Sequence, residues 1–168
     1  RGFLDEGEDG WPNHAFAQRL ANGARVLDVF SHVGGFGLAA LAAGAESALC
    51  VDGSQPALDL AAQGAEAQGV SDRFSARKGD AFDVLTTLAE EGETFDVVIC
   101  DPPAFAPSKQ ALEAGLRAYE RVAQRASALV REGGYLGLCS CSHAADLSKF
   151  RQASTRGIGR AGRRDTLI

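Results

Sequence analysis

The 168-residue sequence has no methionine and no apolar stretch near the roughly 20 residues that a membrane-spanning helix requires. Its four cysteines, at positions 50, 100, 139 and 141, form no CxxC pair and no cysteine–histidine cluster with zinc-finger spacing, so we expect no metal site. The first residues lack the charged-then-apolar layout of a signal peptide. We therefore predict a cytoplasmic protein with reduced thiols and no membrane partner, and we expect the sequence to be a segment of a longer protein.

An excess of basic residues is also lacking, because the formal net charge is −5. This charge argues against a protein that holds nucleic acid by bulk charge alone. The balance is uneven, however: residues 1–150 carry 12 basic and 21 acidic side chains, and residues 151–168 carry five basic and one acidic. The arginines of that tail could meet phosphate groups, or they could be an ordinary solvated helix face.

Short apolar segments alternate with longer Ala- and Leu-rich segments, which is typical of a parallel sheet covered by helices. Residues 95–100 (FDVVIC) are almost continuously apolar, as in a strand that is buried on both faces. We therefore predict an α/β fold with a doubly wound, mostly parallel, Rossmann-like sheet and helices on both faces. The predicted strands are residues 25–30, 47–51, 73–78, 95–100 and 135–140, and the predicted helices are residues 37–43, 55–68, 81–91, 109–130 and 144–155.

The sequence predicts one domain over residues 24–168, preceded by a lead-in segment over residues 1–23. The lead-in combines an acidic loop with a short helix over residues 13–21. Residues 166–168 (TLI) have the composition of a strand that is just beginning. We therefore expect the last strands of the domain to be missing, which would leave the sheet edge open.

A glycine-rich turn follows the first predicted strand, in the sequence DVFSHVGGFG at residues 28–37. Ligands of open parallel sheets bind beyond the carboxyl ends of the strands, and glycines let the backbone approach them closely. Several residues separate this strand from the first glycine, and Asp28 lies inside the strand end. This arrangement suits a ligand with a cationic amino-acid moiety better than a pyrophosphate, although a turn without a ligand is the alternative.

Carboxylates also end the second and third predicted strands. Asp52 could accept both ribose hydroxyls of a nucleoside, or could cap the helix that opens at Gly53-Ser54, or do both. Asp80 could bond an adenine amino group or cap the helix that begins at Ala81.

The fourth and fifth predicted strands end in DPPAF (residues 101–105) and CSCSH (residues 139–143). Two consecutive prolines stiffen the backbone, so the Asp101 carboxylate is held rigidly, and Phe105 could stack on a planar substrate. A plain strand-to-helix connector with a packed Phe is the alternative. Cys141 lies toward the predicted cleft, whereas any single cysteine is more often a small buried residue.

Together these motifs resemble the class I S-adenosylmethionine-dependent methyltransferases. More narrowly, they are similar to the bacterial ribosomal RNA large-subunit methyltransferase I family, which comprises cytosine-C5 methyltransferases of 23S rRNA and their relatives. The resemblance covers about residues 2–168, through LDVFSHVGGF (27–36), VDGSQPAL (51–58), DPPAF (101–105) and SCS (140–142). Members of that family usually carry an N-terminal RNA-binding domain of the PUA type, which is not present in this sequence.

The resemblance implies S-adenosyl-L-methionine as the cofactor and RNA, in particular large-subunit rRNA, as the partner. It assigns Cys141 as a nucleophile that adds to cytosine C6 and so activates C5, with Asp101 on the N3/N4 edge of the base. His143 is a candidate base or a helix cap. Pro102, Pro103 and Phe105 are assigned to the substrate. The residues assigned to the cofactor are Asp28, Phe30, Ser31, Gly34, Gly35, Phe36, Asp52, Gly53, Ser54, Asp80, Ala81 and Asp101.

Three other functions remain open from the sequence. An N-methyltransferase acting on guanine or adenine could use the same proline-rich strand end without needing Cys141. A non-catalytic scaffold would bind adenosylmethionine or RNA without turnover. An NAD(P)-dependent oxidoreductase shares the fold class and would bind a nicotinamide cofactor in place of adenosylmethionine.

Overall fold

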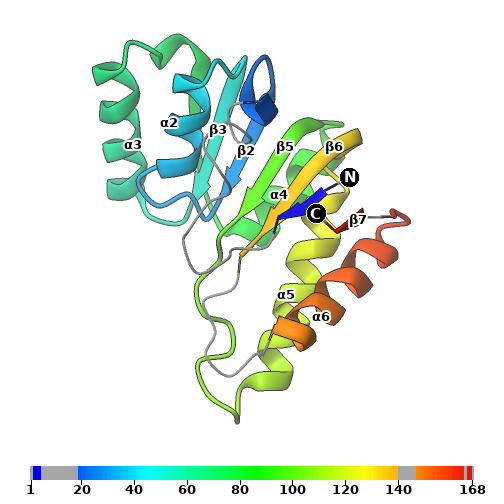
Figure 1. The fold of residues 1–168 in the computed structure, drawn as a ribbon. Helices are drawn as coiled ribbons and strands as arrows, with labels where there is room; N and C mark the ends of the chain where they lie inside the picture. Colours follow the sequence, from blue (N-terminus) through cyan, green and yellow to red (C-terminus); the bar gives the residue numbers. More distant parts are fainter. Residues whose placement is uncertain (1, 5–18, 140–146, 165, 168) are drawn as a thin grey trace.

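The computed structural model describes residues 2–4, 19–139, 147–164 and 166–167, which form one sheet flanked by helices (Figure 1). The described strands lie in the order β4-β3-β2-β5-β6-β1-β7, and every neighbouring pair is parallel. The strands are β1 (Gly2–Leu4), β2 (Arg25–Val29), β3 (Ser47–Asp52), β4 (Phe74–Lys78), β5 (Phe95–Cys100), β6 (Val130–Leu138) and β7 (Thr166–Leu167). The helices are α2 (Gly35–Ala42), α3 (Gln55–Ala67), the short 3-10 helix η1 (Ser71–Arg73), α4 (Ala81–Glu90), α5 (Leu112–Ser127) and α6 (Leu147–Arg160).

Helices cover both faces of this sheet. Successive strand residues point to opposite faces, so Val26 packs in one core with residues of α2 and α3, and Leu27 packs in another with residues of α4, α5 and α6. Both side chains are fully buried. The predicted doubly wound α/β fold is therefore confirmed, with α2 and α3 on one face and α4, α5 and α6 on the other (Figure 1).

The direction of winding reverses between β2 and β5. From β2 the chain builds outward to β3 and β4, and then returns to place β5 against the other side of β2. In an open parallel sheet this switch point is where a crevice opens beyond the carboxyl ends of the strands. The turns after β2, β3, β4 and β5 thus converge on one edge, which we call the carboxyl edge.

Helices α5 and α6 pack closely against each other behind the β5–β6 side of the sheet. Gly157 of α6 makes this possible, because a Cβ atom there would lie 2.2 Å from the carbonyl oxygen of Glu120 and 2.9 Å from the Cβ of Ala123. Tyr119 of α5 in turn meets Phe150 of α6 edge-on, with ring centroids 5.2 Å apart. The two helices therefore form one closely packed pair.

The five predicted strands are all present, with 95–100 matching β5 at both ends. The strand expected to begin at residues 166–168 is confirmed as β7, whereas β1, which pairs with β6 and β7, was not predicted. Residue 30 was wrongly included in the first strand, since Phe30 has a φ of +58° and turns away from it. The last predicted strand, residues 135–140, begins earlier, at Val130, and its described part ends at Leu138.

Helix positions agree with the sequence to within a few residues in most cases. The largest differences are the end of α6, predicted at 155 and found at Arg160, and both ends of α5, predicted over 109–130 and found over Leu112–Ser127. The predicted helix over 13–21 is described only over 19–21, which is helical. No helix in the described ranges is long and apolar enough to cross a membrane.

Candidate active site at the carboxyl edge of the sheet

The turn after β2 holds an unusual backbone. Phe30 and His32 have φ values of +58° and +51°, a left-handed backbone conformation that residues other than glycine rarely adopt. The Ser31 amide, between them, donates to the Val51 carbonyl at 3.0 Å, which ties the turn to β3. Backbone strain of this kind persists only where the surrounding structure enforces it, and it is concentrated at functional sites.

The two glycines assigned to this turn have different roles. Gly34 has a φ of +77°, and a Cβ atom there would lie 2.9 Å from the Cβ of Ala61, so packing against α3 requires glycine. At Gly35 a Cβ atom would meet nothing within 4 Å. Gly35 is therefore the one that leaves open space at the start of α2, where exposed backbone N–H groups favour polar ligands.

Asp28 is the buried acid of the site, with 3% of its surface exposed. Its Oδ2 accepts a hydrogen bond from the Gly37 amide at 2.9 Å, which joins the end of β2 to the first turn of α2. Burial raises the pKa of Asp28 to about 7; the charge of Asp101 also raises it, while the Gly37 hydrogen bond opposes the shift. A cation placed beside Asp28 would favour its ionised form.

Asp52 is the half-buried acid at the end of β3, and two backbone groups fix its orientation. Its Oδ2 accepts from the His32 amide at 2.9 Å, and its Oδ1 accepts from the Ser54 amide at 2.8 Å. The N-cap of α3 is Ser54, whose side chain accepts from the Ala57 amide at 3.3 Å. The alternative that Asp52 itself caps this helix is therefore wrong, and its remaining lone pairs are available to a ligand.

Asp80, at the end of β4, does cap its helix, because its Oδ1 accepts from the Asp83 amide at 3.1 Å at the start of α4. Its neighbour Gly79 donates to the Asp52 carbonyl at 3.1 Å, which ties the ends of β3 and β4 together. The capping alternative is thus confirmed, and a contact between Asp80 or the buried Ala81 and a ligand stays a prediction.

The turn after β5 lies against the turn after β2. The Asp101 amide donates to the Val29 carbonyl at 3.2 Å, and the two carboxylates Asp28 and Asp101 are close enough to raise the pKa of Asp28. Pro102 is buried and Pro103 is exposed. The predicted stiff strand end therefore lies directly beside the turn after β2.

Phe105 belongs to an aromatic cluster that forms one wall of this edge. Its ring centroid lies 6.1 Å from that of Phe30 and of Phe82 and 4.9 Å from that of Tyr119. Its amide also donates to the Tyr119 hydroxyl at 3.4 Å. The packed-Phe alternative thus holds for part of the ring, which is half-buried, and stacking on a substrate stays a prediction.

Three of the four cysteines are buried and in no disulfide, as predicted for core residues: Cys50, Cys100 and Cys139. Burial, followed by the charge of Asp28, raises the pKa of Cys50 to about 12, and the same two causes raise the pKa of Cys100. Neither is a thiolate nucleophile near neutral pH. The predicted nucleophile Cys141 and the candidate base His143 lie outside the described residues.

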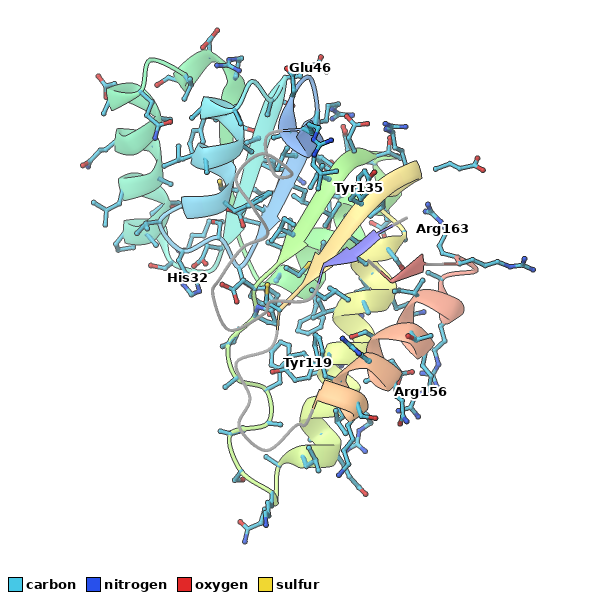
Figure 2. All side chains as sticks on the ribbon, viewed as in Figure 1. His32, Glu46, Tyr119, Tyr135, Arg156 and Arg163 are labelled. Atoms are coloured by element: carbon cyan, nitrogen blue, oxygen red, sulfur yellow. The ribbon has the colours of Figure 1, made fainter. Side chains whose placement is uncertain are left out.

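Two residues of this edge were missed from the sequence. His32 supplies a backbone N–H to Asp52, and Figure 2 places it at the end of the sheet opposite Glu46. Histidine is one of the residue types enriched in the left-handed region, a signal too weak to find it. Tyr119 lies in the middle of α5, and only the fold brings it to Phe105.

Chemically, this edge presents four carboxylates, Asp28, Asp52, Asp80 and Asp101, and an aromatic wall. The Ser31 hydroxyl is buried here beside the Cys50 thiol, to which it forms a side-chain hydrogen bond. A fixed carboxylate with free lone pairs and a buried acid together fit a cationic ligand that carries hydroxyl groups.

Comparison with known proteins identifies the family. The family described as conserved hypothetical protein 95 matches residues 13–136, about three quarters of the chain. The chain belongs to this family. Among curated proteins, "Ribosomal RNA large subunit methyltransferase I" of Photobacterium profundum is 42% identical to this chain over 137 residues. The aligned part covers 81% of this chain and 34% of the relative. The protein of the same name from Aeromonas salmonicida is 38% identical over 162 residues, covering 96% of this chain and 40% of the relative.

The resemblance to that methyltransferase family, predicted from the sequence motifs, is thereby confirmed. The chain spans between a third and two fifths of the length of these two relatives. Among solved structures, the SAM-dependent methyltransferase of Agrobacterium tumefaciens superimposes with a TM-score of 0.72 at 21% identity, covering 86% of this chain and 48% of that one. This likeness confirms the methyltransferase fold.

Proposed function

We propose that this chain is the catalytic domain of an S-adenosylmethionine-dependent methyltransferase that modifies C5 of a cytosine in large-subunit rRNA. The observation that carries the proposal is the carboxyl edge, where two backbone N–H groups orient Asp52 at the end of β3, and the buried Asp28 of β2 lies between it and the turn of Asp101 after β5. The names of the curated relatives support an rRNA substrate.

The cofactor fits this edge by its chemistry. Asp52 would accept hydrogen bonds from the ribose hydroxyls, and Asp80 and Ala81 would lie around adenine. The amino group of the methionine moiety would lie toward Asp28, together with the turn that contains Ser31 and Gly35. Here the remaining assigned residues, Phe30, Gly34, Phe36, Gly53 and Ser54, would shape the walls. The bound cofactor would supply an electrophilic methyl group.

The chain's own residues would activate the base. The Cys141 thiolate forms a bond to cytosine C6, and the electron pair of the C5–C6 double bond moves toward C5 and the N3/N4 edge. A proton shared between the Asp101 carboxyl and N3 would stabilise the negative charge that develops at that edge, and it returns to Asp101 when the thiolate leaves. After C5 gains the methyl group, a base removes the C5 proton, and the electron pair re-forms the double bond and expels the thiolate.

Comparison of two thiols tests this proposal. Wild-type protein, Cys141→Ala and Cys139→Ala are incubated with methyl-labelled adenosylmethionine and undermodified large-subunit rRNA, and the labelled nucleoside is identified by mass spectrometry. We expect 5-methylcytidine from wild type and from Cys139→Ala, and none from Cys141→Ala. Cys139 is the matched control, because it is a buried thiol two residues away.

Two results would contradict the proposed chemistry. Methylation that survives Cys141→Ala, with label on an exocyclic or ring nitrogen, would assign the protein to the nitrogen methyltransferases. Binding of S-adenosylhomocysteine without any methyl transfer by the wild-type protein would favour the non-catalytic scaffold.

A further inference from the structure

A second charged region lies on the outer surface of the helix pair α5–α6, away from the acids of the carboxyl edge. We call it the arginine groove, and define it by Arg117 and Arg121 of α5, Arg156 and Arg160 of α6, and Glu120 at its floor. Residues of both helices line a hollow of about 310 Å³ here. Figure 2 shows the Arg156 side chain on the outer side of α6, directed away from the sheet.

Glu120 organises this groove although it is itself 93% buried. Its Oε1 lies 2.7 Å from Nη1 of Arg160, and its Oε2 lies 4.0 Å from Nε of Arg156. One buried carboxylate thus forms a close ion pair with Arg160 and a longer one with Arg156, and the side chains of Arg156 and Arg160 remain 62% and 67% exposed. Arg121 is fixed as well, with its guanidinium carbon 4.7 Å from the centre of the Phe82 ring.

The groove carries an excess of positive charge that is unusual for this acidic chain. Four arginines face one paired carboxylate, and counting Glu113, one helical turn before Arg117, still leaves an excess of two positive charges. Like charges held this close repel one another, so an anion bound among them gains attraction and relieves that repulsion. Guanidinium groups with exposed N–H donors match phosphate oxygens in particular.

One end of the groove lies toward the carboxyl ends of the strands. The beginning of α5, which includes Arg117 one and a half turns in, projects past these ends (Figure 1). Arg117 also lines the hollow. A chain of phosphates that leaves the carboxyl edge on the β5 side could therefore reach the arginines of α5.

We propose that the arginine groove binds the phosphate backbone of the RNA substrate beside the target nucleotide. This inference rests on the proposed function for its choice of RNA as the polyanion. Phosphate contacts of this kind position a nucleic acid without reading its sequence. The groove would let an acidic protein hold RNA locally, although its net charge opposes binding overall.

The test measures binding of a fluorescein-labelled, mixed-sequence single-stranded RNA by anisotropy over a series of salt concentrations. The main variant combines Arg117→Gln, Arg156→Gln and Arg160→Gln, and a second variant carries Lys at the same three positions. Arg77→Gln is the matched control, because Arg77 lies on β4 at the opposite edge of the sheet and also pairs with a carboxylate, that of Glu91. Binding of S-adenosylhomocysteine, measured by calorimetry, reports on the carboxyl edge.

We expect the triple Gln variant to bind RNA roughly tenfold more weakly or worse, and the slope of log affinity against log salt to fall by about 2. The triple Lys variant should keep most of the affinity, and Arg77→Gln and wild type should agree. RNA affinity of the Gln variant equal to wild type overturns the proposal, and so does a wild type that binds S-adenosylhomocysteine but no RNA. If the Gln variant loses RNA binding while wild type forms no 5-methylcytidine, the groove stands and the proposed chemistry fails.

Discussion

The carboxyl edge and the arginine groove place charge on the same framework by opposite means. At the carboxyl edge, backbone N–H groups hold the carboxylates, and Asp28 is withdrawn from water. In the groove the guanidinium groups of Arg156 and Arg160 stay exposed, and the buried carboxylate of Glu120 pairs closely with Arg160 and more distantly with Arg156. Substitution of a buried charged group should change stability strongly and in a way that depends on pH. Substitution of an exposed charged group should change stability little, and its effect on binding should depend on salt. The contrast predicts which changes should be severe.

The largest effect is expected for Asp52→Ala at the carboxyl edge. In the proposed site this carboxylate would accept two charged hydrogen bonds from the ribose hydroxyls, so its removal should weaken binding of S-adenosylhomocysteine about 100-fold. Calorimetric titration measures the affinity, and Asp72→Ala in the exposed η1 turn is the control. An affinity within threefold of wild type would remove Asp52 from the cofactor site.

The next effect concerns the rigid turn that supports Asp52. Gly34→Ala forces a side chain into a left-handed conformation and against Ala61, so we expect the free energy of unfolding to fall by about 2 kcal/mol or more. Gly35→Ala is the matched control one residue away, where a Cβ meets nothing within 4 Å and the change should be neutral or slightly stabilising. Urea unfolding of both variants measures the difference. Equal stabilities would show that the turn is not held under strain.

A smaller effect, confined to a pH window, is expected for Asp28→Asn. The folded-state pKa of Asp28, about 7, is above its ordinary value of 3.8, so the protonated acid favours folding and that contribution is lost as pH rises from about 4 to 7. Asn cannot ionise and mimics the protonated acid. Between pH 5 and pH 8 the stability of Asp28→Asn should therefore gain about 2 kcal/mol relative to wild type. Parallel pH dependence of the two proteins in urea unfolding would contradict the burial argument.

How far the sequence predicts this structure depends on how local each cause is. The run 95–100 is apolar enough to define β5 completely, and acids at strand ends are visible as such. Strand β1 has three residues, and its existence depends on pairing with β6 and β7, which no local pattern encodes. The start of β6 was not predicted because Gly133-Gly134 is typical of a turn. In the structure these glycines lie within the strand, next to a register shift in its pairing with β5.

The site residues show the same limit. Asp52 and Asp80 each have two plausible roles by sequence, and only the hydrogen bonds separate a ligand-directed carboxylate from a helix cap. The positive φ of His32 follows from the hydrogen bonds of its turn, and Tyr119 reaches Phe105 only through the packing of α5. The sequence shows the cluster of arginines in residues 151–168, but it does not show that Arg156 and Arg160 lie beside Glu120 of α5.

The smallest effect on stability is expected in the groove itself, and it sharpens the contrast with the carboxyl edge. Arg117 is exposed on α5, so Arg117→Gln should change the free energy of unfolding by less than about 0.5 kcal/mol. The same substitution should weaken RNA binding about threefold at low salt and lower the salt slope by about 0.7, the value for one phosphate contact with a single strand. Anisotropy titration and urea unfolding of the same preparation separate the two quantities. A variant that unfolds more easily yet binds RNA normally would make Arg117 a structural residue, because an exposed charge that serves binding should affect affinity and leave stability unchanged.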